Sequence, residues 1–280
     1  MELFLFLGSL FAFLFIGIPI SMVLVLCSIV LMWHSGMWDS MIIPSTMLDG
    51  ANNYPLMAIP FFVFAGEIMA EGGLSKRVVQ LAQLMIGRVR GGLGYAAIIS
   101  SVIFAGLMGS SVGEAAALGG LLLPMMAEVG YKPGRAGGVI ASGAILGPII
   151  PPSIIMILYA TEANVNVSDM FKAGIIPGIL VGLMLMAACK FMFMRGEKAP
   201  PATKFSWKRL GVSLKDGVLA IIAPAIILMG MFSGSFSPTE AGIVAVVYST
   251  VVGMIYKELK LKDIPRIIKE SAIAAAQVMF

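Results

Sequence analysis

Two short segments interrupt an otherwise apolar sequence, and both contain groups that could bind an ion. The first, residues 109–114, reads Gly-Ser-Ser-Val-Gly-Glu, and the second, residues 147–153, reads Gly-Pro-Ile-Ile-Pro-Pro-Ser. Hydroxyl and carbonyl oxygens, which the first segment offers, are the ligands that hard cations prefer. The prolines of the second segment lack N–H donors, so carbonyls that a regular helix would use internally become available to a ligand.

Several side chains allow a structural as well as a chemical interpretation. Glu114 would lie in the first turn of a helix, where an acid stabilises the N-terminus by about 0.3–1 kcal/mol, or it could line a cavity. Residues 237–240, Ser-Pro-Thr-Glu, predict a capping box at the start of another helix. His34, the only histidine, follows Trp33 and is typical of the aromatic belt at a membrane surface.

The composition argues against catalytic chemistry. The two cysteines each lie within an apolar run, and the sequence has no HExxH, GxSxG or paired-aspartate pattern. A single histidine forms neither a triad nor a metal cluster. We therefore expect neither an enzyme nor a nucleic-acid partner.

The elements that would position the two segments are transmembrane helices. With 59% apolar and 12% charged residues among 280, the chain has more apolar surface than a soluble core could bury, so the surplus would face the lipid bilayer. A span needs about 20 apolar residues. The N-terminal run has no basic region or cleavage site and should remain as the first helix. The predicted spans are 3–32, 54–72, 136–160, 173–194, 217–233 and 239–256, with a further apolar stretch from Ser271.

The stretch 94–130 does not fit a single span, because glycines and serines interrupt its centre. We expect two half-length helices around a polar tip. Basic residues flank both ends: Lys76, Arg77, Arg88, Arg90, Lys132 and Arg135. Since basic loops prefer the cytoplasm, the stretch should be a re-entrant hairpin that enters and leaves by that face.

This topology places every Lys and Arg except Lys172 on the cytoplasmic side of a bacterial inner membrane. Segments 74–89 and 205–217 mix apolar and basic residues and should be interfacial arm helices, with 258–270 as a shorter third arm. The predicted fold is an all-α polytopic membrane protein with a re-entrant hairpin, a broken transmembrane helix and amphipathic arms.

A hairpin tip and a broken helix at membrane depth are the parts from which secondary transporters build their sites. Unwound carbonyls hold Na⁺, and helix N-termini face anionic substrates. Two alternatives remain: the breaks could be packing kinks, or a glycine-rich loop could line a channel.

Three motifs carry a family resemblance: GLMGSSVGEAAALGGLLLPMMAEVGY, GRAGGVIASGAILGPIIPPSIIMILYA and FSPTEAGIVAVVYS. Together they resemble the large membrane (M, DctM-like) subunit of TRAP transporters, most closely the sialic-acid, SiaM-like branch. The resemblance implies a Na⁺-coupled elevator fold of the ion-transporter superfamily. It also implies a small membrane subunit (Q), a periplasmic substrate-binding protein (P) and a small carboxylate substrate, sialic acid or a C4-dicarboxylate.

The family carries its hairpin and broken helix twice as inverted repeats, so this chain would hold the N-terminal two thirds. We expect scaffold helices and an arm in 1–89, the hairpin and broken helix of the transport domain in 90–172, and scaffold with the start of the second repeat in 173–280. The implied Na⁺ ligands come from the tip and the break: Gly109, Ser110, Ser111, Gly113, Gly147, Pro148, Ile149 and Ile150. The implied substrate-side residues are Glu114, Pro151 and Ser153.

Overall fold

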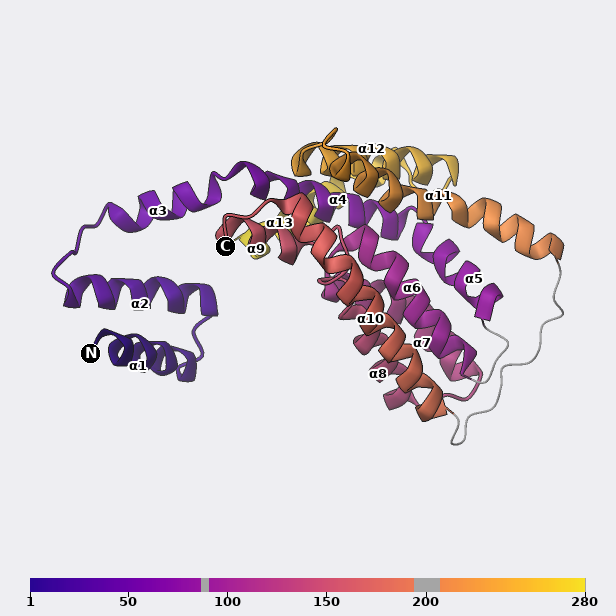
Figure 1. Cartoon of the computed structure of the whole chain (residues 1–280), viewed down its shortest axis with the longest axis horizontal. Helices are drawn as coiled ribbons and strands as arrows, with labels where there is room; N and C mark the ends of the chain where they lie inside the picture. The colour runs from indigo at the N-terminus through magenta and orange to yellow at the C-terminus, as the bar shows by residue number, and fades with distance from the viewer. Residues whose placement is uncertain (87–90, 194–206, 280) are drawn as a thin grey trace. The chain divides into compact units, whose positions relative to one another are not determined.

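The computed structural model describes residues 1–86, 91–193 and 207–279, with the backbone alone for 192, 193 and 207–216 (Figure 1). These residues form helices and no strands, as expected for an all-α protein. The chain divides into two compact units, one holding Met1–Asn53 with Gln277–Phe280 and the other Tyr54–Ala276. Both segments singled out above lie in the second unit. The functional division at residues 89 and 172 stays a prediction.

The first unit corrects the expected span 3–32. The chain forms two helices there, α1 (Glu2–Phe15) and α2 (Ile20–His34), which pack side by side. Gly17 has φ +88° and Pro19 caps α2, so the chain turns between them instead of continuing as one helix. A third helix, α3 (Ile42–Ala51), occupies a region that the sequence assigned to a loop.

The two helices of the predicted hairpin are confirmed, with one correction, while its entry and exit by one face of the membrane stay a prediction. Helices α6 (Gly92–Met108) and α7 (Ser111–Glu128) meet at Gly109 and Ser110. They are not half-length: 17 and 18 residues at 1.5 Å each give about 26 Å, close to a bilayer core. The helices continue through Gly106 and Gly113 because a glycine costs only about 1 kcal/mol against Ala, and Gly106 also permits close packing. A Cβ on Gly106 would lie 3.1 Å from Pro224 Cβ.

Helix α5 (Leu74–Ile86) forms where the sequence predicts the first arm, and residues 87–89 lie outside the described part. Its position at a membrane interface stays a prediction. The helix follows η1 (Tyr54–Met57) and α4 (Ala58–Glu71) and packs along the hairpin. Leu74, Val78 and Leu81 are buried. The arm therefore supports both helices of the hairpin.

The broken helix is also confirmed. Helix α8 (Pro133–Ala144) ends before the proline-rich segment and α9 (Ile154–Glu162) begins after it. Residues 145–153 between them are not helical, and the Pro151–Pro152 peptide bond is cis. Three prolines within five residues prevent the regular hydrogen bonds of a helix, as the sequence predicted.

Two other arms are not separate elements. Residues 207–217 belong to one continuous helix, α11 (Trp207–Phe232), and α13 (Ile264–Met279) begins inside the expected arm 258–270 after η2 (Leu261–Asp263). The glycines of the former segment cost only about 1 kcal/mol each against Ala, so a helix can pass through them. Residues 205 and 206 lie outside the described part.

Among the described residues, three helices are long and apolar enough to cross a membrane: Tyr54–Glu71, Val167–Phe191 within α10 (Val167–Phe193), and Pro238–Ile255, which is α12. They correspond to three of the predicted spans. Shorter apolar helices are Glu2–Phe15, Ile20–His34, Gly92–Met108 and Gly217–Phe232. The predicted capping box at Ser237 and Glu240 is present.

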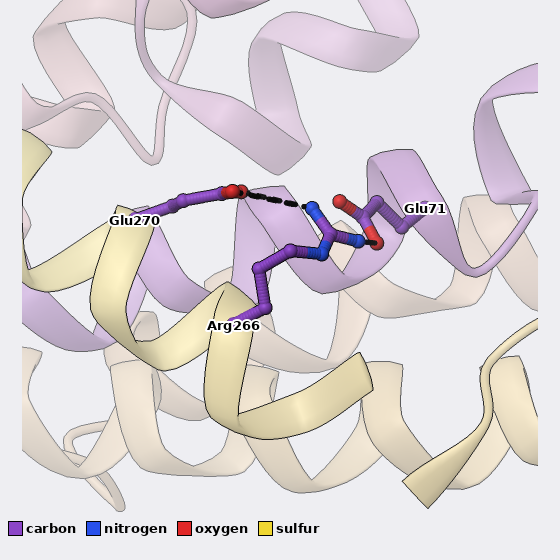
Figure 2. A network of polar contacts seen from close by, with 3 residues as sticks. All are labelled: Glu71, Arg266 and Glu270. Carbon is purple, nitrogen blue, oxygen red and sulfur yellow. Dashed lines mark hydrogen bonds and ion pairs between the residues drawn. The ribbon is translucent and has the colours of Figure 1, made fainter. Parts of the chain in front are cut away.

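Helices α4 and α12 pack against each other, and polar contacts of the adjoining segments η1 and α5 lie near their two ends. At the N-terminal ends, Thr239 Oγ1 donates to the Tyr54 carbonyl at 3.1 Å. At the opposite ends, Arg77 pairs with Glu258 at 3.0 Å. Arg266 of α13 lies between Glu71 of α4 and Glu270 of its own helix (Figure 2). These contacts link η1, α4 and α5 to α12, α13 and the segment between them.

Candidate ion and substrate site

The hairpin tip touches the end of the break. Gly109 ends α6 in the left-handed conformation, with φ +58°. A Cβ added there would lie 2.7 Å from the Pro152 carbonyl oxygen and 3.0 Å from Ser153 Cα. Only a glycine allows both this conformation and this approach. The two segments that the sequence separates by more than thirty residues are therefore in backbone contact.

A second contact joins the start of the break to the start of α7. A Cβ on Gly147 would lie 2.8 Å from Glu114 Oε2 and 3.2 Å from the Ser110 carbonyl carbon. Tip and break thus meet at both ends of the proline-rich segment. This is the juxtaposition from which a site of neutral oxygens could be built.

Glu114 lies fully buried at this contact, with 0% of its surface exposed. Neither carboxylate oxygen accepts a hydrogen bond from the described residues. Ser101 of α6 is the polar side chain beside it, but no hydrogen bond of normal geometry joins the two. Of the two sequence interpretations, the burial favours a side chain that faces the interior over a solvated helix cap.

Ser110 and Ser111 lie at the tip with part of their surface exposed. Ser110 caps α7, because its Oγ accepts from the Gly113 N–H at 3.5 Å, which is long for a hydrogen bond. The Ser110 hydroxyl is thus held only weakly by the chain itself.

The other end of the break is more tightly bound internally. The hydroxyl of Ser153 donates to the Pro148 carbonyl at 2.8 Å and accepts from the Met156 N–H at 3.4 Å. Pro151 and Ser153 are buried, while Pro148, Ile149 and Ile150 are partly exposed. Ser153 therefore fixes the end of the break and caps α9.

Two glycines of α10, which were not predicted as site residues, pack against the break. A Cβ on Gly174 would lie 2.6 Å from the Ile149 carbonyl oxygen, and one on Gly178 would lie 2.5 Å from Ile150 Cγ1. The break is therefore held between the hairpin tip and α10. Their four-residue spacing is the small-residue pattern of close helix packing in membranes, and it could have revealed them.

Comparison with known proteins identifies the family. The model of the family "Tripartite ATP-independent periplasmic transporter, DctM component" matches residues 7–280. The chain belongs to the DctM family. DctM proteins are the large permeases of TRAP transporters, which are transporters and not enzymes.

Three relatives show the range of the DctM family. The 2,3-diketo-L-gulonate TRAP permease YiaN of Escherichia coli is 41% identical over 100% of this chain and 66% of its own length. The C4-dicarboxylate permease DctM of Pseudomonas aeruginosa is 36% identical over 84% of the chain and 55% of its length. The sialic acid permease SiaM of Vibrio cholerae is 34% identical over 97% of the chain and 65% of its own length. The chain thus spans about two thirds of the length of YiaN.

The donor groups at the contact between tip and break suit the Na⁺ that the DctM resemblance implies. They are hydroxyl, carbonyl and carboxylate oxygens, the ligands of hard cations. A buried carboxylate without a hydrogen bond is the group that such a cation would neutralise. Within the described residues, no group of three or more His, Cys, Asp or Glu could hold a metal ion. The residues that the family resemblance implies as ligands remain predictions.

A separate cavity of about 300 Å³, which no sequence pattern predicted, lies between α6, α8 and α10. Arg135, Ser142 and Cys189 line it together with mainly apolar atoms. None of the residues at the tip or the break lines this cavity. It is therefore distinct from the contact described above.

Proposed function

We propose that this chain is part of a Na⁺-coupled secondary transporter that imports a small carboxylate across the bacterial inner membrane. The observation that carries the proposal is the backbone contact between Gly109 of the hairpin tip and Pro152 of the break. Broken elements that meet at membrane depth are how transporters expose carbonyls and helix N-termini to ions and anions. Membership of the DctM family agrees with this assignment.

The proposed cation ligands are the oxygens of the tip, from Ser110 or Ser111, and carbonyls of residues 147–150. Na⁺ bound there would hold the two broken elements together. Binding of cation and substrate should therefore be positively coupled, typically by about 1–3 kcal/mol. When bound, the cation supplies positive charge for an anionic substrate.

The tripartite assembly and the elevator motion are proposals of the same kind. The family description names a tripartite transporter, which fits a small membrane subunit and a periplasmic substrate-binding protein as partners. In an elevator motion, the hairpin and the broken helix would move together against the scaffold. Their contacts at Gly109 and Gly147 suit movement as one body.

The substrate is proposed as a carboxylate, with sialic acid as the candidate that the sequence motifs favour. The relatives' names extend the choice to 2,3-diketo-L-gulonate and C4-dicarboxylates. All three classes are organic acids, so the carboxylate is the group that they share. A helix N-terminus such as that of α7 attracts an anionic group.

The test is uptake into proteoliposomes that contain the full-length permease, its small subunit and the matching binding protein. Labelled sialic acid, 2,3-diketo-L-gulonate and a C4-dicarboxylate are offered in turn, with an inward Na⁺ gradient or with choline. We expect uptake of one of them only with Na⁺. Uptake or counterflow that needs no Na⁺ would contradict the Na⁺ coupling. Flux that does not saturate and shows no counterflow would favour a channel, and either result would contradict the proposal.

A further inference from the structure

The cavity between α6, α8 and α10 lies among helices that pack side by side (Figure 1). Close to the break there is no such gap, because Gly178 and Gly182 of α10 pack against the side chains of Ile150 and Leu146. Towards the start of α8, small residues face each other across the two helices. Their side chains do not fill the space between the helix backbones, so a cavity remains.

The wall that α8 gives to the cavity consists of Gly134, Gly138 and Ser142, which lie four residues apart on one face of the helix. A Cβ on Gly134 or Gly138 would meet no atom within 4 Å. At 1.5 Å of rise per residue, this wall is about 12 Å long. Ala188 and Cys189 of α10 line the opposite side. Because Gly134, Gly138 and Ala188 are exposed, the cavity opens to the surface of the described part of the chain.

The charge of the cavity is positive and lies at one end. Arg135 is the only charged residue among the described residues that line it. The others are apolar or glycine, apart from Ser142 and Cys189. Arg135 belongs to the first turn of α8, where the dipole of the helix also favours a negative charge. A basic end and a long apolar wall together complement an amphipathic anion.

We propose that this cavity binds an anionic phospholipid, with the phosphate beside Arg135 and part of one acyl chain along the wall of α8. Basic pockets between transmembrane helices on the cytoplasmic side suit anionic headgroups, and the predicted topology places the start of α8 on that side. About 300 Å³ is at the lower end of ligand-pocket volumes, so it suits part of a chain and not a whole lipid. A hydrophilic organic acid would gain little from the apolar wall.

The test uses the thiol of Cys189, which lines the cavity and is only 4% exposed. In the purified full-length permease, with every other cysteine replaced, N-ethylmaleimide reaches this thiol through the open cavity. Detergent micelles contain added phosphatidylglycerol or, for comparison, zwitterionic phosphatidylcholine. A site that is about 90% occupied leaves about a tenth of the thiols accessible, so phosphatidylglycerol should slow labelling about tenfold. Phosphatidylcholine should slow it much less.

Charge variants test the headgroup end of the site. Arg135→Gln should make labelling of Cys189 equally fast in the two lipids, because the attraction to the phosphate is lost. Arg135→Lys keeps the charge and should retain a preference for phosphatidylglycerol. Lys132→Gln is the matched control, because it removes the same charge from an exposed residue that is not among those lining the cavity. A preference that survives in Arg135→Gln, or disappears in Lys132→Gln, would overturn the proposal.

Gly138→Leu tests the apolar part of the site. The added side chain would occupy the cavity, and Leu favours a helix more than Gly does, so the variant should fold. Phosphatidylglycerol should then no longer change the labelling rate. Equal labelling of the wild type in both lipids would overturn the proposal. A thiol that does not react in detergent alone would show that another part of the permease fills the cavity, and would overturn it too. Neither result affects the proposed Na⁺ coupling, because uptake is not the readout.

Discussion

The carboxylate of Glu114 occupies the space in which a side chain on Gly147 would begin. Its Oε2 lies 2.8 Å from the position of a Cβ on Gly147, which is closer than real Cβ contacts allow. One residue belongs to the first turn of α7 and the other to the segment that separates α8 from α9. The absence of a side chain at Gly147 thus permits a carboxylate to lie directly against the break.

This relationship predicts the effect of Gly147→Ala. The added methyl group would displace Glu114 and press on the Ser110 backbone, so we expect a loss of about 1–3 kcal/mol of stability and weaker Na⁺ activation of uptake. Thermal unfolding and the Na⁺ dependence of uptake measure the two effects. Gly137→Ala in α8 is the control, because a Cβ there meets no atom within 4 Å. Equal behaviour of the two variants would show that the contact is unimportant.

Gly109→Ala should impair uptake more than its backbone strain explains. A left-handed conformation costs a non-glycine residue about 1–2 kcal/mol, and the added Cβ would also overlap the Pro152 carbonyl oxygen. Gly130→Ala provides the comparison, because Gly130 has φ +90° and open space around its Cβ position. The difference in unfolding midpoint and uptake between the variants isolates the contact between tip and break. No difference would mean that strain alone acts.

Replacing both Ser110 and Ser111 with Ala should raise the Na⁺ concentration needed for half-maximal uptake. The substitution removes two hydroxyl oxygens from the proposed site, while the long cap bond of Ser110 contributes little stability. Expression and binding to the periplasmic protein should stay largely intact. A well-folded double variant with an unchanged Na⁺ response would leave the tip as a structural turn, and loss of stability alone would indicate capping.

The topology can be tested with single cysteines in a background without Cys27 and Cys189. Lys76→Cys on the arm and Lys132→Cys after the hairpin should react with an impermeant maleimide from the cytoplasmic side, because basic segments prefer that face. Ala163→Cys, beyond α9, should react from the opposite side. All three positions are exposed. Labelling of Lys76→Cys and Lys132→Cys from different sides would contradict the hairpin topology.

Local sequence alone sets the positions at which the backbone breaks at the site. Prolines 148, 151 and 152 lack N–H groups, and the glycine at 109 permits a left-handed turn, so both interruptions follow from local sterics. Local chemistry also accounts for the capping box at Ser237. Helix continuity was less predictable. An apolar run does not reveal the turn at Gly17, and a polar, glycine-containing run does not prevent α11 from continuing.

The contacts that these breaks make depend on tertiary packing. The approach of Gly109 to Pro152, the packing of Gly174 against Ile149 and the burial of Glu114 against Gly147 depend on how α6, α7, α8 and α10 pack. Nothing within a few residues of Glu114 distinguishes a solvated helix cap from a buried carboxylate. That difference is set by neighbouring helices, which exclude water from the side chain and bring a segment some thirty residues away against it.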